Sequence, residues 1–283
     1  MSGSSPVGGG KGVLSLTFDN LGEAAELEIG ALPAGVPLGG HITATEVVPE
    51  LLDRLAEVAL AATFFVEGLN TEIYPELLQR INASGHEVAY HAWRHEDWAG
   101  LPPTEQADNL ARGLAGFERL GLRVSGLRPP GGSLGPDGLG VLRQAGLRYC
   151  SPAGEGAGED GGVALLPFQW RHVDASCVLP PLADARVQMT GSPDPVMPTD
   201  FLVSLERSID RLASDGGYLA IVLHPFMLAW LGDESLTALL DRIATAVSEG
   251  DLRVARCDEV ADHVLAHPDR FAGGTTLDAT TWA

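Results

Sequence analysis

Short runs of apolar residues alternate along the chain with longer segments in which apolar residues recur every three or four positions. The short runs have the length of strands, and the longer segments are typical of amphipathic helices. Strands are predicted at 13–18, 62–66, 87–90, 124–127, 148–151, 217–223 and 252–255. Helices are predicted at 45–60, 74–83, 104–120, 137–145, 199–213, 234–248 and 258–266. This alternation favours a mostly parallel sheet covered by helices.

Residues 13–266 are expected to form one α/β domain, because the chain of 283 residues is close to the roughly 250 that a (β/α) barrel uses as one unit. The segment 1–12, rich in glycine and serine, is expected to be flexible, and 267–283 to be a polar tail. The glycine-rich segment 154–162 is predicted to be a mobile loop. Prolines and irregular spacing leave 165–198 without an assignment.

Composition excludes several classes of function. Thirty-eight acidic and eighteen basic side chains give a formal charge of −20, which repels phosphate backbones, so nucleic acid is not an expected partner. The longest apolar runs, such as 58–66 and 218–223, are well short of the roughly 20 residues that span a bilayer. Segment 1–12 lacks the apolar stretch of a secretion signal, so a cytoplasmic protein is expected. The oligomeric state stays open, a homo-oligomer included.

Polar residues follow four of the predicted strands, and the carboxyl ends of strands are where an α/β barrel places its active site. Two imidazoles four positions apart follow the third strand, and such a pair can direct ring nitrogens at one divalent ion. The polar residues at these strand ends are Asp19, Asn20, His91, His95, Arg128 and His224. Their occurrence at successive strand ends predicts a common site.

Four short motifs carry a resemblance to a known family. They are TFDN at 17–20, HAWRH at 91–95, RPPGG at 128–132 and LHP at 223–225. In this order they resemble the motifs of the polysaccharide deacetylases, the NodB homology domain of carbohydrate esterase family 4, over nearly the whole chain. The resemblance implies an irregular (β/α) barrel of a single domain. It also implies a divalent metal, commonly zinc, that activates water to hydrolyse an N- or O-acyl group.

The resemblance further assigns catalytic roles. It makes Asp19 the general base and Arg128 the residue that orients it. It makes His224 the general acid, and Asp174 resembles the carboxylate that orients this histidine, although the spacing around Asp174 departs from the family pattern. These roles agree with elementary chemistry, because hydrolysis of an amide needs a base for the water and an acid for the leaving amine.

The same resemblance makes His91, His95 and Asn20 the metal ligands. The family usually has aspartate at the position of Asn20, and an amide oxygen brings no charge, so a weaker metal site is expected. Glu23 lies one turn further on and is a candidate for the missing charge, although an exposed glutamate at a helix start more often interacts with the helix dipole. Ala92 replaces a common serine or threonine and removes no ligand.

A substrate pocket is expected around aromatic side chains and one backbone donor. The residues are Trp93, Trp98, Phe168, Trp170 and Phe226, with Gly131 near a backbone N–H for the oxyanion. The segments 166–170 (LPFQW) and 223–226 (LHPF) resemble the intracellular branch of the family, which includes allantoinase-like and cyclic-imide-processing members. We therefore expect a hydrolase of a non-peptide C–N bond in a small molecule or sugar, with linear amides favoured over cyclic ones.

Two other functions remain open. Residues 131–135 (GGSLG) match GxSxG, a turn that can present Ser133 as a nucleophile, with Asp174 and His224 in suitable chain order. Alternatively, Asn20 marks a catalytically inactive barrel that binds an acylated ligand. The deacetylase hypothesis is preferred because Asp19 and His224 are both retained, and a binding protein has no need of an acid and a base.

Overall fold

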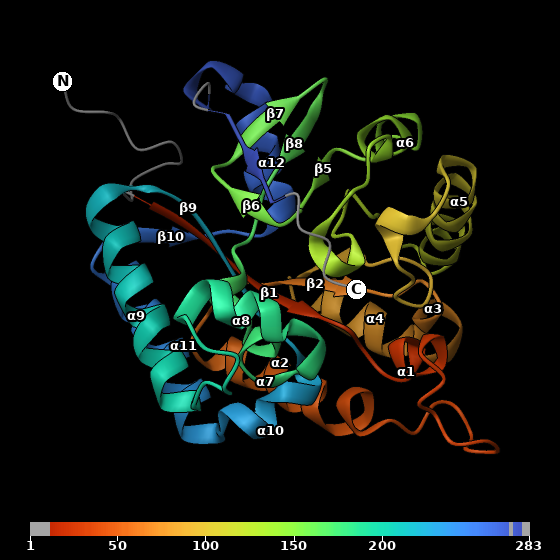
Figure 1. The fold of residues 1–283 in the computed structure, drawn as a ribbon, viewed down its shortest axis with the longest axis horizontal. Helices are drawn as coiled ribbons and strands as arrows, with labels where there is room; N and C mark the ends of the chain where they lie inside the picture. Colours follow the sequence, from red (N-terminus) through yellow and green to blue (C-terminus); the bar gives the residue numbers. More distant parts are fainter. Residues whose placement is uncertain (1–11, 272–273, 279–283) are drawn as a thin grey trace.

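The longest strand, β1 (Gly12–Asp19), lies at the centre of the sheet and is buried along its whole length. The computed structural model describes residues 12–271 and 274–278. β9 (Gly217–Leu223) pairs in parallel with one edge of β1. On the other edge, β10 (Leu252–Val254) pairs with the beginning of β1 and β2 (Thr63–Val66) with its end, both in parallel. β1 therefore joins the two halves of the sheet (Figure 1).

Beyond β2 the sheet curls. It continues in parallel through β3 (Glu87–Tyr90), β4 (Gly126–Leu127), β5 (Tyr149–Cys150) and β8 (Val163–Leu165). β7 (Gly158–Asp160) ends this edge as an antiparallel partner of β8. Single parallel bridges join Ala153 to Phe168 and Val173 to Val222, and they extend the wall back toward β9. This half-barrel confirms the predicted irregular (β/α) barrel of a single α/β domain.

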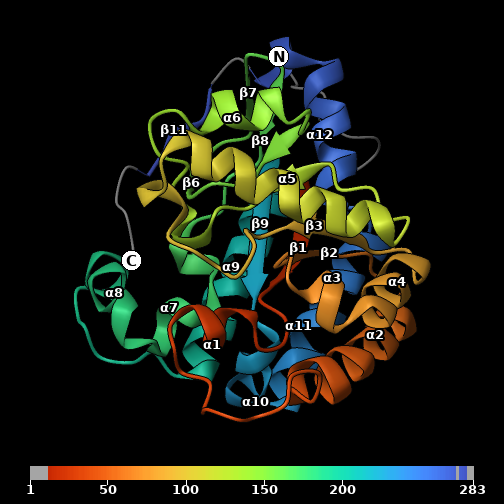
Figure 2. The same cartoon turned by 90° about the vertical axis from the view of Figure 1, so that its right-hand side faces the viewer.

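Helices surround the curled sheet (Figures 1 and 2). Their inner faces carry apolar residues at helical spacing, as in α2, where Val48, Leu51, Leu52 and Leu55 are buried. The helices are α1 (Ala24–Glu28), α2 (Val48–Glu57), α3 (Asn70–Ile73), α4 (Pro75–Ala83), α5 (Pro103–Arg119), α6 (Gly138–Gln144), α7 (Asp174–Val178), α8 (Ala183–Thr190), α9 (Pro198–Asp215), α10 (Leu228–Leu231), α11 (Asp233–Ser248) and α12 (Cys257–Ala266).

Glycine- and proline-rich segments contain short elements that the hydrophobic pattern does not reveal. The prediction of a loop at 154–162 is wrong in part, because this segment contains β6 (Gly154–Glu155) and β7. β6 pairs with β11 (Thr276–Leu277), which lies within the predicted polar tail. The unassigned segment 165–198 holds α7 and α8. Elements this short give no periodic signal. The predicted flexible segment 1–12 lies outside the described residues, except for Gly12.

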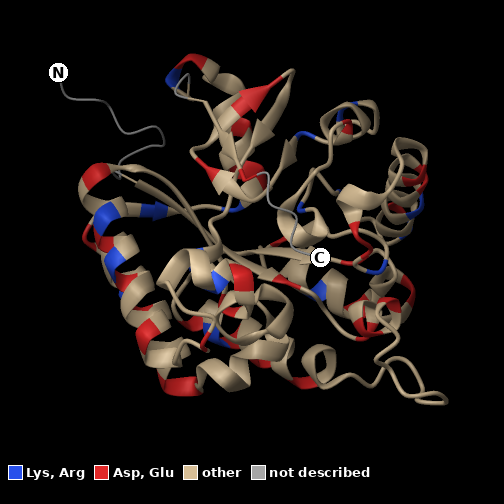
Figure 3. Cartoon of the chain, in the orientation of Figure 1, with Lys and Arg blue, Asp and Glu red and all other residues tan. Residues whose placement is uncertain are grey.

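Most charged residues lie on the helices around the sheet, whereas the main core is apolar. Figure 3 shows acidic residues on the helices around the sheet, with fewer basic residues among them. The main core joins Leu14, Leu16 and Phe18 of β1 to the buried faces of α2, α4, α9 and α11. Not one helix in the described ranges combines the length and the apolarity that a bilayer crossing requires.

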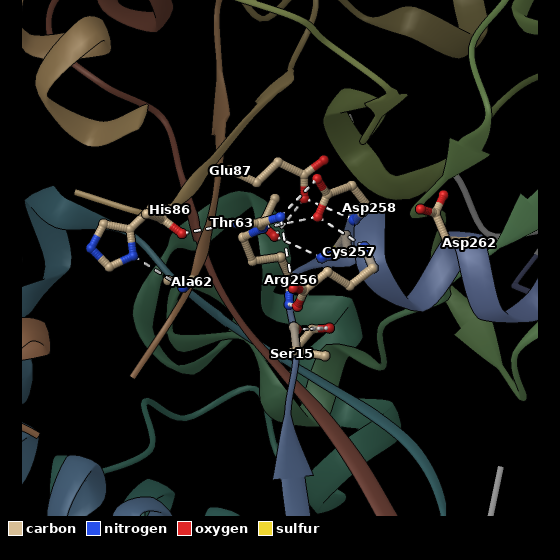
Figure 4. Close-up of polar contacts among 12 residues, drawn as sticks. Ser15, Ala62, Thr63, His86, Glu87, Arg256, Cys257, Asp258 and Asp262 are labelled. Carbon is tan, nitrogen blue, oxygen red and sulfur yellow. Dashed lines mark hydrogen bonds and ion pairs between the residues drawn. The ribbon is translucent and has the colours of Figure 1, made fainter. Parts of the chain in front are cut away.

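A buried polar cluster lies at the amino ends of β2 and β3, opposite to the predicted site (Figure 4). Both carboxylate oxygens of Glu87 accept hydrogen bonds, from Tyr149 Oη at 2.8 Å and from Thr63 Oγ1 at 2.8 Å. The backbone N–H of Asp258 donates to Glu87 at 3.0 Å, and that of Cys257 to Thr63 at 2.9 Å. The cluster therefore fastens the first turn of α12 to the sheet, and burial raises the pKa of Glu87 to about 7.

Tyr149→Phe removes the hydroxyl that donates to Glu87 and keeps the ring. We expect a loss of about 1–3 kcal/mol in the free energy of unfolding, because one oxygen of a buried carboxyl group loses its partner. Urea denaturation measures this loss. In a cycle with Glu87→Gln, the effects of the two substitutions should be non-additive. An unfolding midpoint unchanged by Tyr149→Phe would contradict a role of this cluster in stability.

Candidate active site

The polar residues at the strand ends meet at one mouth of the half-barrel. Asp19 is the last residue of β1, and His91 directly follows β3. Arg128 directly follows β4, and His224 directly follows β9. Because these strands are parallel neighbours, their carboxyl ends bring residues that are far apart in the sequence to one end of the sheet.

A buried ion pair joins Arg128 to Asp19. The distance from Arg128 Nη1 to Asp19 Oδ1 is 2.6 Å, and both side chains are almost fully buried. Arg128 also donates to Thr17 Oγ1 at 2.8 Å and, through Nε and Nη2, to Ser151 Oγ at 3.2 and 2.9 Å. Its guanidinium lies 4.0 Å above the ring of Phe65. Arg128 therefore has a single orientation, and it fixes the carboxylate of Asp19.

A second pair joins His224 to Asp174. The distance from His224 Nδ1 to Asp174 Oδ1 is 2.5 Å, and the backbone N–H of His224 donates to Asp174 Oδ2 at 2.8 Å. Ala175 N–H donates to Asp174 Oδ1 at 2.6 Å. Burial alone would lower the pKa of His224, but the Asp174 carboxylate more than offsets burial and raises this pKa above its usual value. The pair therefore favours an imidazolium.

His91 and His95 form a pair of neutral imidazoles. Their ring centroids are 4.9 Å apart, with the rings at 70° to each other. His91 Nδ1 lies 2.7 Å from the carbonyl oxygen of Arg128; a carbonyl only accepts, so Nδ1 carries the proton and Nε2 keeps its lone pair. Burial lowers the pKa of His91 to about 3, and burial together with His91 lowers that of His95 to about 3.

Asn20 completes the set of metal donors that the sequence predicts. Its Oδ1 is buried and has no hydrogen-bond partner within the described residues. Two neutral imidazoles and an unpartnered amide oxygen fit a divalent ion, but they bring no negative charge to it. In the part of the chain that the structure describes, no three His, Cys, Asp or Glu residues lie close enough together to hold a metal. Asparagine at position 20 is consistent with this finding.

Two aromatic residues lie beside the ion pairs. Phe226 is 43% exposed, and its ring centroid is 5.2 Å from that of His224. Phe168 lies 5.1 Å from the guanidinium carbon of Arg128 and packs edge-on against Trp170 at 5.3 Å. Phe226 is thus the most exposed member of the predicted aromatic set.

Trp93 and Trp98 do not take the places expected of pocket residues. Trp98 is completely buried in the main core. Trp93 is 4% exposed, and Arg112 stacks on its ring at 3.6 Å. Both side chains pack inside the protein because α5 covers this part of the sheet, and the expectation that Trp98 contacts substrate is wrong for this structure.

Gly131 has a φ of +70°, a conformation that favours glycine.

The structure brings in residues that the sequence analysis did not name. Thr17 and Ser151 hold Arg128, as described above. Glu67 directly follows β2, is completely buried, and burial raises its pKa to about 8. The rule that polar residues at strand ends build the site applies equally to Glu67, so this signal was present in the sequence.

The prediction that Glu23 is an exposed glutamate is wrong. Glu23 is 2% exposed, and it accepts hydrogen bonds from Tyr74 Oη at 2.5 Å and from Gly39 N–H at 2.9 Å. Its carboxylate holds the loop before α2, so it is not available to replace a charge at the metal site.

Ser133 shows no sign of activation by a base. Its Oγ accepts a long hydrogen bond of 3.4 Å from Gly135 N–H, and within the described residues no hydrogen bond links Ser133 to His224. The nucleophilic-serine alternative therefore lacks the contact that it requires.

A family model described as polysaccharide deacetylase matches residues 7–150, just over half of the chain. The chain belongs to the polysaccharide deacetylase family. A similar curated protein is a chitooligosaccharide deacetylase of Bradyrhizobium, which is 42% identical over 62 residues. That match covers 22% of this chain and 28% of the relative, so the chain matches less than a third of the relative's length.

Two solved structures of similar fold span nearly the whole chain. One is a protein of Mycobacterium smegmatis described as a candidate polysaccharide deacetylase. It is 25% identical to this chain, and the two structures have a TM-score of 0.78 over 94% of this chain and 95% of that one. The other is the Puue allantoinase, with 19% identity and a TM-score of 0.73 over the same shares of the two chains. The likeness to the allantoinase shows that this chain and the allantoinase share a fold.

Arg128→Met leaves the buried carboxylate of Asp19 without its partner. We expect a loss of about 3–5 kcal/mol in the free energy of unfolding, because an uncompensated buried charge is strongly unfavourable. Urea denaturation monitored by circular dichroism measures the loss. Arg54→Met is the matched control: its ion pair with Asp233, at 3.0 Å, is exposed, so it should cost less than about 1 kcal/mol. Equal losses in the two variants would contradict the central role of Arg128.

Proposed function

We propose that this polysaccharide deacetylase hydrolyses the N-acetyl bond of an amino sugar or of a related small amide, a non-peptide C–N bond. The observation that carries the proposal is the presence of two separate pairs of oppositely charged side chains at one mouth of the half-barrel, Arg128 with Asp19 and Asp174 with His224. A carboxylate held by a cation suits a base, and a histidine held by a carboxylate suits an acid.

Asp19 would accept the proton of the attacking water. Arg128 occupies Oδ1 of this carboxylate and fixes its direction, so the base does not rotate away from the water. A divalent ion held by Asn20, His91 and His95, with zinc the candidate, would polarise the amide carbonyl and acidify the water. The N–H of Gly131 is the proposed backbone donor for the developing oxyanion.

His224 would protonate the leaving nitrogen. An amine is a poor leaving group until it is protonated, so the acid must hold its proton at neutral pH. Asp174 binds Nδ1 of the His224 ring, and this leaves Nε2–H free to donate. The contribution of the His224–Asp174 pair is therefore a proton held at Nε2 for the leaving group.

Support for an N-acetylated sugar comes from family membership and from the chitooligosaccharide deacetylase among the relatives. Phe226 offers an accessible apolar face of the kind that packs against a sugar ring. Cyclic amides are the second candidate, favoured by the neutral donor set around Asn20, which departs from that of the sugar deacetylases. A substrate panel therefore includes N-acetylglucosamine oligomers, small linear N-acyl compounds and cyclic imides.

Asp19→Asn and His224→Ala should each lower turnover by at least about 100-fold, because each removes a proton-transfer partner. Release of the free amine from N-acyl compounds and formation of the ring-opened carboxylate from cyclic imides measure this loss. Ser133→Ala is the matched control and should stay within about threefold of the wild type, since this hydroxyl is not activated. Wild-type turnover in both Asp19→Asn and His224→Ala would reject the proposed roles.

Asn20→Asp separates an enzyme from an inactive barrel. If the natural chain is the proposed enzyme, the wild-type protein itself hydrolyses a member of the panel. If only Asn20→Asp protein shows metal-dependent hydrolysis, the natural chain is a binding protein for an acylated ligand.

The pH profile of kcat/KM should report the raised pKa of His224. The acid form is required, so activity is lost as pH rises through this pKa. Asp174→Asn removes the negative charge that raises the pKa, and we expect the alkaline limb to move to lower pH. An alkaline limb that stays in place in Asp174→Asn would contradict the role of His224 as the acid.

A further inference from the structure

The proposed metal ligands bring no charge to a divalent ion. Histidine ligates a metal through a neutral imidazole, as His91 and His95 would, and Asn20 offers an amide oxygen. The carboxylates of the two catalytic pairs are each bound to a cationic side chain. A dication in a buried site is stabilised by a nearby negative charge, so a further carboxylate near these ligands would strengthen binding.

Glu67 lies where such a carboxylate is needed. The parallel register pairs Val66 with Tyr90, which places Glu67 beside His91 at the ends of neighbouring strands. Side chains alternate along a strand, so Glu67 shares a face with Phe65, and Phe65 contacts Arg128 in the interior of the half-barrel. Glu67 has no exposed surface. It also interacts electrostatically with groups of the site, since the Asp19 carboxylate raises its pKa in addition to burial.

One oxygen of Glu67 holds the turn that carries Asn20. Glu67 Oε2 accepts from the backbone N–H of Leu21 at 3.1 Å and from Asn70 Nδ2 at 3.0 Å. Asn70 Nδ2 also donates to the carbonyl oxygen of Leu21 at 2.6 Å. Both polar backbone groups of Leu21 are thereby bound, directly after Asn20 adopts a φ of +63°. The hydrogen bonds around Leu21 compensate for a backbone conformation that asparagine adopts less readily than glycine.

The other oxygen of Glu67 has no partner. Glu67 Oε1 and Asn20 Oδ1 are both buried acceptors without a hydrogen bond in the described residues. Buried oxygens of this kind are rare in folded proteins, because each has given up hydration without compensation. Two such acceptors, on residues that directly follow the neighbouring strands β1 and β2, make this region favourable for a cation.

Glu23 shows what a buried glutamate looks like when its role is structural. It lies in the same region of the chain as Asn20, and its two carboxylate oxygens bind Tyr74, Gly39 and Gly40. These hydrogen bonds lower its pKa against the effect of burial. Glu67 differs in having one oxygen bound and one unpartnered.

We propose that Glu67 is a positioning residue of the metal site: its carboxyl group fixes the turn that carries Asn20, and as a cation binds it releases its proton and supplies the negative charge that the three ligands lack. Glu67 is not itself a ligand, which agrees with the absence of a close group of three His, Cys, Asp or Glu among the described residues. The proposal rests on the proposed function only in taking Asn20, His91 and His95 as the ligands.

The test is metal affinity, measured without turnover. Protein without a histidine tag is stripped with a chelator and titrated with Zn²⁺ against a chromophoric chelator, and with Co²⁺ by visible absorption. Glu67→Gln keeps the shape of the side chain and removes the charge, and we expect Zn²⁺ to bind at least about 10-fold more weakly. Glu67→Asp keeps the charge and shortens the side chain, and it should lose less affinity than Glu67→Gln.

Two further variants complete the test. Adding Asn20→Asp to Glu67→Gln should restore Zn²⁺ affinity at least to the wild-type level, because it puts the carboxylate back next to the ion. Glu23→Gln is the matched control, a buried glutamate whose two oxygens are both bound by other residues, and it should bind Zn²⁺ within about twofold of the wild type. The Co²⁺ spectrum of Glu67→Gln at saturation should match that of the wild type, because the ligands are unchanged.

Several outcomes would overturn the proposal. The first is wild-type protein that binds neither Zn²⁺ nor Co²⁺, and the second is Glu67→Gln protein with the Zn²⁺ affinity of the wild type. The third is a loss of Zn²⁺ affinity in Glu67→Asp that equals or exceeds the loss in Glu67→Gln. The fourth is an altered Co²⁺ spectrum in Glu67→Gln, which would make Glu67 a ligand. Thermal unfolding of each metal-free variant checks that it folds. Hydrolysis by the wild type and its loss in Asp19→Asn are independent of these titrations, so the proposed function can stand if the role of Glu67 fails.

Discussion

The buried guanidinium of Arg128 is the interaction on which the geometry of the site depends. It connects β1, through Thr17 and Asp19, with Ser151 at the end of β5. Its own carbonyl oxygen sets the tautomer of His91 after β3. A charge in this position is tolerated only with a paired carboxylate and a full set of acceptors. The same residue therefore fixes the Asp19 carboxylate, orients the ring of His91 and joins the strand ends of the mouth.

The two ends of the half-barrel handle buried polar groups differently. At the amino ends, the Glu87 carboxyl group has a partner for each oxygen, which is the pattern of a structural anchor. At the carboxyl ends, Asn20 and Glu67 each keep an unpartnered oxygen. A fold gains stability from the first arrangement and loses some in the second. These two unsatisfied acceptors thus lie where a ligand could satisfy them.

Electrostatics divides the mouth into paired and neutral parts. Asp19 and His224 each have an oppositely charged partner, and the Asp174 carboxylate raises the pKa of His224 above its usual value. The histidines that would face a metal stay neutral because they are buried. A site arranged in this way can bind a cation with His91 and His95 without competition from protons at neutral pH.

The alternation of apolar runs and amphipathic segments was sufficient to predict a mostly parallel sheet covered by helices, because burial on both faces imposes continuous apolar runs on strands such as β1. The irregular barrel was implied by the resemblance of the four motifs to the family. The placement of Asp19, His91, Arg128 and His224 after strands could also be predicted, since parallel strands direct their carboxyl ends to one side. Short elements such as β6, β7 and α7 could not be predicted, because they bury too few residues to leave a period. Tertiary packing alone decided that Trp98 belongs to the core, that Glu23 is bound by Tyr74, and that Glu67 has a free oxygen beside the site. These outcomes depend on which neighbours fill the space and donate hydrogen bonds, and such neighbours come from distant parts of the chain that no local pattern identifies.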